Sequence, residues 1–342
     1  MPINSDLSLL SDYAIQGTFL AYLVALVLSL TSYVKLQGVI KNRRALKDRE
    51  EVNDRELAAV GAGGSGDGAG EDPARPVEDL PTEGELDRRE DSAHTWGKAA
   101  QSVVWLGIIL HAAGIVARGF AVQRFPLGNL YEYMLAITGV AMLVAALVIQ
   151  RKSLRFAWPW VLTAILVLLF YGSTKLYAES APVVPALQSH WLPFHVTTVS
   201  VGGSLGLISG LFSALYLLRV WQPAGKERGV AGAIARPLPT ARRLDEIAYR
   251  LAVFTLPILG VGILLGAIWA DTAWGRPWGW DPKETLSFIT WILYAAYLHA
   301  RATAGWRVGA AWINILALAA MIFNLFFVNL VISGLHSYAG LN

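Results

Sequence analysis

The sequence contains no cysteine. This absence excludes disulfides, Cys-ligated zinc, iron–sulfur clusters and a cysteine nucleophile, and it also excludes a haem attached covalently to this chain. Charged residues are scarce as well. They make up 15% of the 342 residues, where a soluble domain carries about 25%. Apolar residues account for 55%. This composition argues against a soluble globular protein and predicts an all-α polytopic membrane protein.

Long charge-free runs mark the predicted membrane spans, because a helix crosses the hydrocarbon core with about 20 residues. Eight runs have this character, and two are longer than one helix needs. The run over 180–218 begins with a proline-containing loop, so its helix is expected to start near His195. The run over 308–342 ends in a Ser/Gly-containing tail, so its helix is expected to stop near Ser333. The eight predicted spans are residues 13–34, 99–117, 133–150, 156–174, 195–218, 251–270, 285–300 and 308–333.

Lysine and arginine in the loops orient these spans, because both residues are enriched on the cytoplasmic side. The loops that follow spans one, three, five and seven are rich in them. The alternate loops contain only Arg118, Arg124, Lys175, Arg276 and Lys283. The loops after spans one, three, five and seven are therefore predicted to be cytoplasmic. With eight spans, both termini are then predicted to lie outside.

The few charged residues are concentrated in one segment. Residues 41–91 hold 9 Lys/Arg and 15 Asp/Glu, so this segment is acidic and the rest of the chain is basic. Residues 57–95 are also rich in Gly, Glu, Asp and Pro, which bury too little apolar surface to offset the entropy of ordering. We predict an N-terminal transmembrane helix with a charged cytoplasmic extension over 1–56, a disordered cytoplasmic linker over 57–98, and the remaining transmembrane helices over 99–342.

A tryptophan-rich segment lies between spans six and seven, in a loop predicted to be on the outer face. It reads Trp274-Gly-Arg-Pro-Trp278-Gly-Trp280-Asp281-Pro-Lys-Glu284. Tryptophan is enriched at membrane interfaces in any case, but three such rings in seven residues would form a flat apolar plate suited to a large planar ligand. Asp281 and Glu284 have a structural alternative, because an N-cap, a proline and a capping box would start the seventh helix.

Histidines provide the second signal. His195 starts the fifth span and His336 follows the eighth, both on the predicted outer face. Taken alone, either histidine is explained as a polar anchor at the membrane interface. Two histidines beside the tryptophan-rich segment suggest two axial ligands to a porphyrin iron. His111 and His299 lie inside spans, where an ionisable residue is a functional hypothesis by default. Packing is the alternative for His111, and a snorkelling polar cap beside Arg301 is the alternative for His299.

Arg118 and Arg124 are cations on the face where cations are sparse. Guanidinium groups pair well with carboxylates, so haem propionates are candidate partners. Glu132 follows closely along the chain and could instead pair with both arginines, leaving nothing for a ligand. The sequence leaves both interpretations open.

The tryptophan-rich segment resembles the signature of haem-handling cytochrome c assembly proteins. The resemblance is to the CcsA/ResC branch, for which the name CcsB is also used in actinobacteria, with CcmC and CcmF more distant. It covers roughly residues 99–342. Besides the tryptophan-rich segment it includes residues 125–132, 187–196, 297–301 and 334–340.

The resemblance implies that His195 and His336 ligate the iron of haem b beside the tryptophans and Asp281. It implies that His299 corresponds to the family's intramembrane histidine, which receives haem from the cytoplasmic side with an axial partner from a ResB/CcsB-type protein. The chain would then be the haem-binding subunit of a cytochrome c synthase. Its location would be the plasma (inner) membrane, with the haem site on the extracytoplasmic side.

In that family, haem is presented to an apocytochrome with a Cys-x-x-Cys-His motif, and each vinyl group forms a thioether with a cysteine thiol. The expected partners are the ResB/CcsB-type protein, the apocytochrome, membrane lipid and a thiol-reducing thioredoxin-like protein, with no nucleic acid. Two other classes stay open as alternatives. One is a haem carrier or chaperone without lyase activity, and the other is a di-haem b-type electron carrier.

Overall fold

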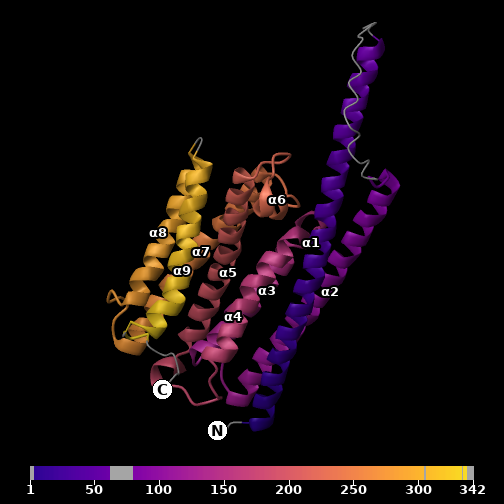
Figure 1. Ribbon diagram of the computed structural model, residues 1–342. Helices are drawn as coiled ribbons and strands as arrows, with labels where there is room; N and C mark the ends of the chain where they lie inside the picture. Colours follow the sequence, from indigo (N-terminus) through magenta and orange to yellow (C-terminus); the bar gives the residue numbers. More distant parts are fainter. Residues whose placement is uncertain (1–3, 62–79, 304–305, 333, 337–342) are drawn as a thin grey trace.

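The computed structural model describes residues 4–61, 80–303, 306–332 and 334–336. Within these ranges all regular elements are helical, which confirms the all-α prediction. The long helices stand side by side as one elongated bundle, from which α1 projects at one end (Figure 1). The α-helices are α1 (Ser5–Gly61), α2 (Glu83–Val122), α3 (Leu130–Val148), α4 (Trp158–Lys175), α5 (Trp191–Trp221), α6 (Gly229–Ala235), α7 (Ala241–Trp274), α8 (Pro282–Ala302) and α9 (Arg307–Leu330), and the 3-10 helices are η1 (Lys152–Ala157) and η2 (Pro185–Gln188).

Among the described helices, seven are long and apolar enough to cross a membrane. They correspond to the predicted spans one to six and eight. The predicted seventh span forms α8, whose ends are more polar because Lys283 and Glu284 lie in its first turn and His299 and Arg301 in its last. α8 nevertheless packs beside α7 and α9. The count of eight spans and the outer placement of both termini stay predictions.

The predicted linker over 57–98 requires a correction, because residues 83–98 form the first turns of α2. The Thr82 hydroxyl accepts a hydrogen bond from the backbone N–H of Glu85 at 3.3 Å, and the Glu85 carboxylate accepts one from the backbone N–H of Thr82 at 3.1 Å. This capping box satisfies free donors at the helix start. Residues 62–79 of the predicted linker lie outside the described residues.

Pairing between α1 and α2 further explains why this charged segment is helical. Three acidic residues of α2 recur at helical spacing and therefore share one face. Arg43 of α1 forms ion pairs with all three, namely Glu83, Asp87 and Glu90. From composition alone, so many charged residues predict disorder. In the fold, opposite charges of α1 and α2 face one another and favour the ordered helices.

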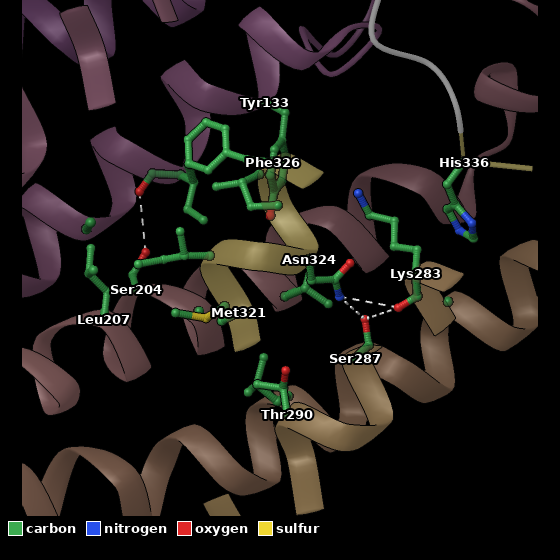
Figure 2. A pocket seen from close by; sticks show the side chains of 18 of the residues that line it. Tyr133, Ser204, Leu207, Lys283, Ser287, Thr290, Met321, Asn324, Phe326 and His336 are labelled. Atoms are coloured by element: carbon green, nitrogen blue, oxygen red, sulfur yellow. Dashed lines mark hydrogen bonds between the residues drawn. The ribbon is translucent and has the colours of Figure 1, made fainter. Parts of the chain in front are cut away.

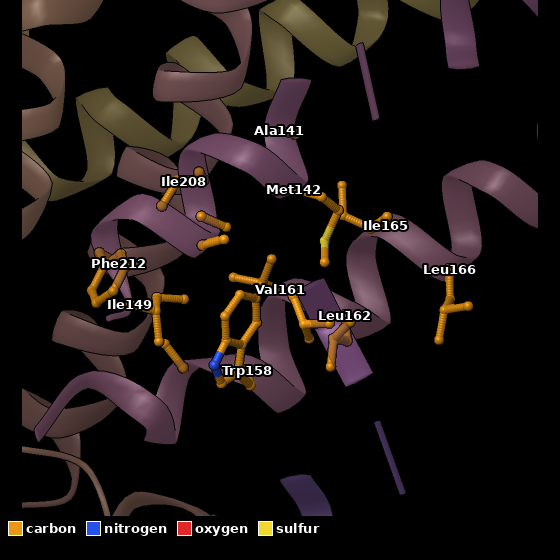
Figure 3. Close-up of a cluster of buried hydrophobic side chains, with 14 of the residues drawn as sticks. Ala141, Met142, Ile149, Trp158, Val161, Leu162, Ile165, Leu166, Ile208 and Phe212 are labelled. Carbon is orange, nitrogen blue, oxygen red and sulfur yellow. The ribbon is translucent and has the colours of Figure 1, made fainter. Parts of the chain in front are cut away.

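The main hydrophobic core lies between α3, α4 and α5, as Figure 3 shows. Met142 of α3, Trp158 and Leu162 of α4, and Ile208 and Phe212 of α5 are each at most 1% exposed. Their burial is the kind of close packing that fixes neighbouring helices relative to one another. α5 also contacts α7 and α9, so it connects this core to the other half of the bundle.

A buried ion-pair cluster joins α1 to the loop after α5, at the end of the bundle predicted to be cytoplasmic. Glu227 accepts hydrogen bonds from Arg44 of α1 at 2.6 Å and from Arg219 of α5 at 2.9 Å. Burial raises the pKa of Glu227, but the two guanidinium groups outweigh this effect and lower the pKa to about 2. The carboxylate is therefore charged at neutral pH and ties α1 to the rest of the bundle.

We call the opposite end of the bundle the site end. There α2, α4, α7 and α9 finish, and α3, α5 and α8 begin. The tryptophan-rich segment connects α7 to α8 at this end, and residues 334–336 follow α9 there. Because successive long helices run in opposite directions, the predicted outer loops lie together at this end.

Candidate functional site

His195 lies in the second turn of α5 and faces α7. Its Nδ1 lies 2.8 Å from the carbonyl oxygen of Gly262. A carbonyl only accepts, so this contact assigns the ring proton to Nδ1 and leaves the Nε2 lone pair available to a metal. Gly266 makes room for the ring, because a Cβ at this position would lie 2.7 Å from Cε1 of His195.

His336 is held by Asp281 in a similar way. The two side chains meet through Nδ1 and Oδ1 at 2.8 Å, so Nδ1–H donates and Nε2 is again free to ligate. A histidine whose other nitrogen donates to a carboxylate is a recurrent arrangement at metal sites. Burial lowers the pKa of His336, which favours the neutral imidazole that binds metals.

Asp281 also begins α8, which confirms the structural interpretation considered for it. It is the N-cap of α8, and the predicted capping box with Glu284 is present. Its second carboxylate oxygen, Oδ2, accepts the backbone N–H of Leu335 at 2.9 Å. Burial raises the pKa of Asp281, but the Leu335 N–H and the His336 ring outweigh burial and hold it below the usual value. One carboxylate therefore starts a helix and orients a histidine.

Trp269 is a site residue that the sequence analysis missed. Its ring lies 5.9 Å from that of His195, nearly parallel at 12°, and 5.7 Å from that of His336. It is 2% exposed, and its indole N–H donates to the carbonyl of Ala186 at 3.0 Å. A single tryptophan inside an apolar span looks like ordinary core in a sequence. Its closeness to Trp274 along the chain was the one available signal.

The predicted flat plate of tryptophans is wrong. Trp278 and Trp280 meet with their rings at 87°, and Trp274 packs against Trp269 at 63° and against His336 at 76°. The chain turns sharply here, because Trp280 has a left-handed backbone with φ of 58°. Its side chain is 66% exposed. The segment thus gives its three rings separate positions instead of one surface.

A cavity of about 700 Å³ lies beside these residues, between α3, α4, α5, α7, α8 and α9. This volume is in the range of small-molecule and cofactor sites, which are about 300–1,000 Å³. His195, Trp278, Lys283 and His336 border it near the site end, and its wall is mostly apolar. Figure 2 shows Lys283 and His336 on one side and Tyr133 and Ser204 further along the cavity.

The two histidines fit a planar ligand that brings its own metal donors. Within the described part of the chain, no group of three or more His, Cys, Asp or Glu residues gathers to hold a metal ion. The two imidazoles that border this cavity would hold the iron of a haem, whose porphyrin would supply the other four donors. The donor set therefore fits a haem better than a bare ion.

Arg118 and Arg124 are engaged elsewhere. Arg118 Nε lies 3.1 Å from Glu132 Oε1, and Arg124 Nη1 lies 2.8 Å from Glu132 Oε2. Glu132 is 1% exposed, and neither arginine borders the cavity. The contacts match the alternative in which Glu132 pairs with both cations.

His299 and His111 do not reach the cavity either. His299 is exposed on α8, next to the ion pair in which Arg301 Nε lies 3.0 Å from Asp245 Oδ1. His111 is buried, and its Nδ1 lies 3.4 Å from the hydroxyl of Tyr22 on α1. The surroundings of His111 match the packing alternative, whereas His299 is left facing out of the bundle.

Comparison with known proteins identifies the family of this chain. The family model described as "Cytochrome C assembly protein" matches residues 127–336, which include both histidines and the tryptophan-rich segment. "Cytochrome c biogenesis protein CcsA" of Guillardia theta is 35% identical over 64% of this chain and 78% of its own length. The protein of the same name from Gloeobacter violaceus is 30% identical over 75% of this chain and 89% of its own length. The chain belongs to the cytochrome c assembly protein family, in its CcsA-type branch.

A solved structure, "Cytochrome c Heme Lyase CcmF", has the same fold, with a TM-score of 0.59 and 16% sequence identity. The match covers 95% of this chain and 47% of that chain, so this protein spans about half the length of CcmF. The chain is thus a multi-pass helical membrane protein of cytochrome c biogenesis.

Proposed function

We propose that this protein is the haem-binding subunit of a membrane cytochrome c synthase. It moves haem b to the outer face and presents it to apocytochromes that carry a Cys-x-x-Cys-His motif. One observation carries the proposal. His195 and His336 border the same cavity, and each donates its Nδ1–H to a protein acceptor, which leaves both Nε2 atoms available to iron.

The protein's contribution to the reaction is to bind, orient and shield. Haem supplies the iron and the two vinyl groups. Each cysteine thiol adds across one vinyl double bond, with sulfur bonding to one carbon and the thiol hydrogen to the other, so the addition needs no oxidant or reductant. His195 is held by the carbonyl of Gly262 on α7, and His336 is held by Asp281. The apolar wall limits contact of the bound haem with water.

His299 supports a second haem position that needs a partner. On the same face of α8 lie Ile289, Ile292 and Ala296, all exposed like His299 itself. Within the described residues the imidazole of His299 makes no hydrogen bond. A polar ring in an apolar stripe is costly against lipid, so this face suits a ResB/CcsB-type partner that covers it and supplies the other axial ligand.

The test is co-expression with a ResB-type partner and a Cys-x-x-Cys-His reporter, followed by a haem stain after denaturation. His195→Ala and His336→Ala should each abolish covalent haem on the reporter, and added imidazole should partly restore it by occupying the vacant coordination position. His190→Ala is the matched control, because His190 is exposed and does not border the cavity. Normal maturation by either alanine variant, at equal protein level, would contradict the proposal.

The same experiment separates the carrier alternative. A haem carrier without lyase activity would be purified with haem bound through both histidines, yet the reporter would gain no covalent haem from the complex with its partner. A synthase subunit gives both signals. A di-haem electron carrier would keep its haem in the presence of the apocytochrome, and the apocytochrome would gain no covalent haem.

The proposed sidedness has a simple test because the chain contains no cysteine. In single-cysteine variants, a membrane-impermeant maleimide therefore labels this chain only at the introduced residue. Lys175→Cys, at the site end, should react in intact cells, whereas Asp48→Cys, in the projecting part of α1, should react only after permeabilisation. The reverse pattern would place the cavity on the cytoplasmic side.

A further inference from the structure

Lys283 is a cation at the cavity that nothing in the site so far uses. It is the second residue of α8 and borders the cavity together with His195 and His336. Its Nζ donates a hydrogen bond to Asn329 Oδ1 of α9 at 2.8 Å. No carboxylate of the described chain forms an ion pair with it, so its protein partner is neutral.

The acidic residues nearest to Lys283 along the chain, Asp281 and Glu284, already accept hydrogen bonds from other groups. Asp281 accepts hydrogen bonds from His336 and Leu335. Glu284 accepts the backbone N–H groups of Gly279 and Asp281 at 2.9 and 3.1 Å, and it faces Arg276 at 3.5 Å. Within the described chain, Lys283 therefore forms no ion pair beside an apolar wall.

The position of Lys283 in its helix makes this charge more costly. The start of a helix carries the positive end of the helix dipole, so a cation in the first turn is disfavoured. A lysine beside an apolar cavity also loses hydration, and it regains stability when an anion binds there. Both effects point to an anionic group in the cavity.

Haem carries two carboxylates that need cationic partners. Among the lysines and arginines of the described chain, Lys283 is the one that borders the cavity. Arg118 and Arg124 share Glu132, and Arg276 faces Glu284. Figure 2 shows the Lys283 side chain extending from α8 beside Asn324 and His336. Resting on the haem-binding function proposed above, we propose that Lys283 binds a propionate carboxylate of the haem held by His195 and His336.

This contact would solve a problem that two axial ligands leave open. Ligation by His195 and His336 fixes the iron and an axis through it, but the porphyrin can still rotate about that axis. A charged contact at one edge of the ring fixes the rotation. The vinyl groups lie away from the propionate edge, so anchoring a propionate at Lys283 determines where the cysteine thiols must approach.

The experiment compares haem b with its dimethyl ester, which lacks both negative charges. The full chain is purified in detergent, and binding is followed by the Soret absorbance. A hydrogen bond to a charged group contributes about 1.5–3 kcal/mol, so the wild type should bind haem b about 10- to 100-fold more tightly than the ester. Lys283→Met should lose most of this preference, and Lys283→Arg should keep most of it.

Lys175→Met is the matched control, because Lys175 is exposed at the same end and does not border the cavity. It should keep the full preference for haem b. Equal preference in Lys283→Met and wild type, with haem binding still dependent on both histidines, would refute the role of Lys283 and leave the haem site intact. A wild type without preference would refute it without any variant. Absence of haem binding by the wild type would refute the proposed function itself.

Discussion

Replacing Asp281 with asparagine separates its two roles. As the N-cap of α8, Asp281 accepts the backbone N–H of Lys283 at 3.2 Å through Oδ1. Asparagine caps helices about as well as aspartate, so the start of α8 should persist. Oδ1 also accepts the Nδ1–H of His336, and Oδ2 accepts the backbone N–H of Leu335. An asparagine has one oxygen and no charge, so it loses the contact to Leu335 and the charge that strengthens the hydrogen bond from His336.

The expected loss of haem affinity follows from the acceptor oxygen and the charge that asparagine lacks. The variant forfeits one charge-assisted hydrogen bond, which contributes about 1.5–3 kcal/mol, and loss of such a partner typically lowers metal affinity about 10- to 100-fold. Haem affinity of Asp281→Asn should therefore fall by that factor, while thermal stability without haem changes little. Asp281→Ala should lose the same affinity and also about 1 kcal/mol of stability, because the cap is gone.

The assay is a haem titration of both purified variants, read beside thermal unfolding of the haem-free proteins. An Asp281→Asn protein with wild-type haem affinity and an unchanged Soret band would refute the reasoning. Asp281 would then be a helix cap only, and His336 would not depend on it for its orientation.

Three further perturbations follow from the geometry. Gly266→Ala should weaken haem binding, because its Cβ would lie 2.7 Å from the histidine ring on α5, whereas Gly38→Ala, with nothing within 4 Å, should bind haem normally in the same titration. Trp278→Tyr should lower the haem-to-protein ratio of purified membranes more than Trp280→Tyr, because only Trp278 borders the cavity; equal ratios would contradict this. Glu227 has a lowered pKa, so its stabilisation is complete above about pH 4.5 and is lost as pH falls towards 2. That difference corresponds to about 3 kcal/mol, and unfolding of Glu227→Gln should depend less on pH over this window.

Local chemistry was predictable from the sequence. The start of α8 follows from an aspartate, a proline and a glutamate in adjacent helix-start positions, and the structure has that capping box. Length and apolar character predicted the long helices. Alternation of spans then placed His195 and His336 at one end, and the structure brings both to one cavity.

Contacts between distant segments were not predictable. Whether Arg118 and Arg124 serve a ligand or Glu132 depends on how α2 and α3 pack. Lys283 reads as one more charge at a helix start until α9 and the cavity are placed beside it. Residues 83–98 look disordered by composition because the α1 side chain that pairs with them is far away in sequence.

The length of α1 has a consequence for the electrostatics of the protein. Its 57 residues extend about 85 Å at 1.5 Å per residue, so the part beyond the predicted span reaches about 40 Å from the hydrocarbon core. At physiological salt, charges are screened over about 8 Å. The acidic residues near the tip of α1 are therefore several screening lengths from the lipid headgroups. Their charge acts on molecules in the aqueous phase and contributes almost nothing to how the protein sits in the bilayer.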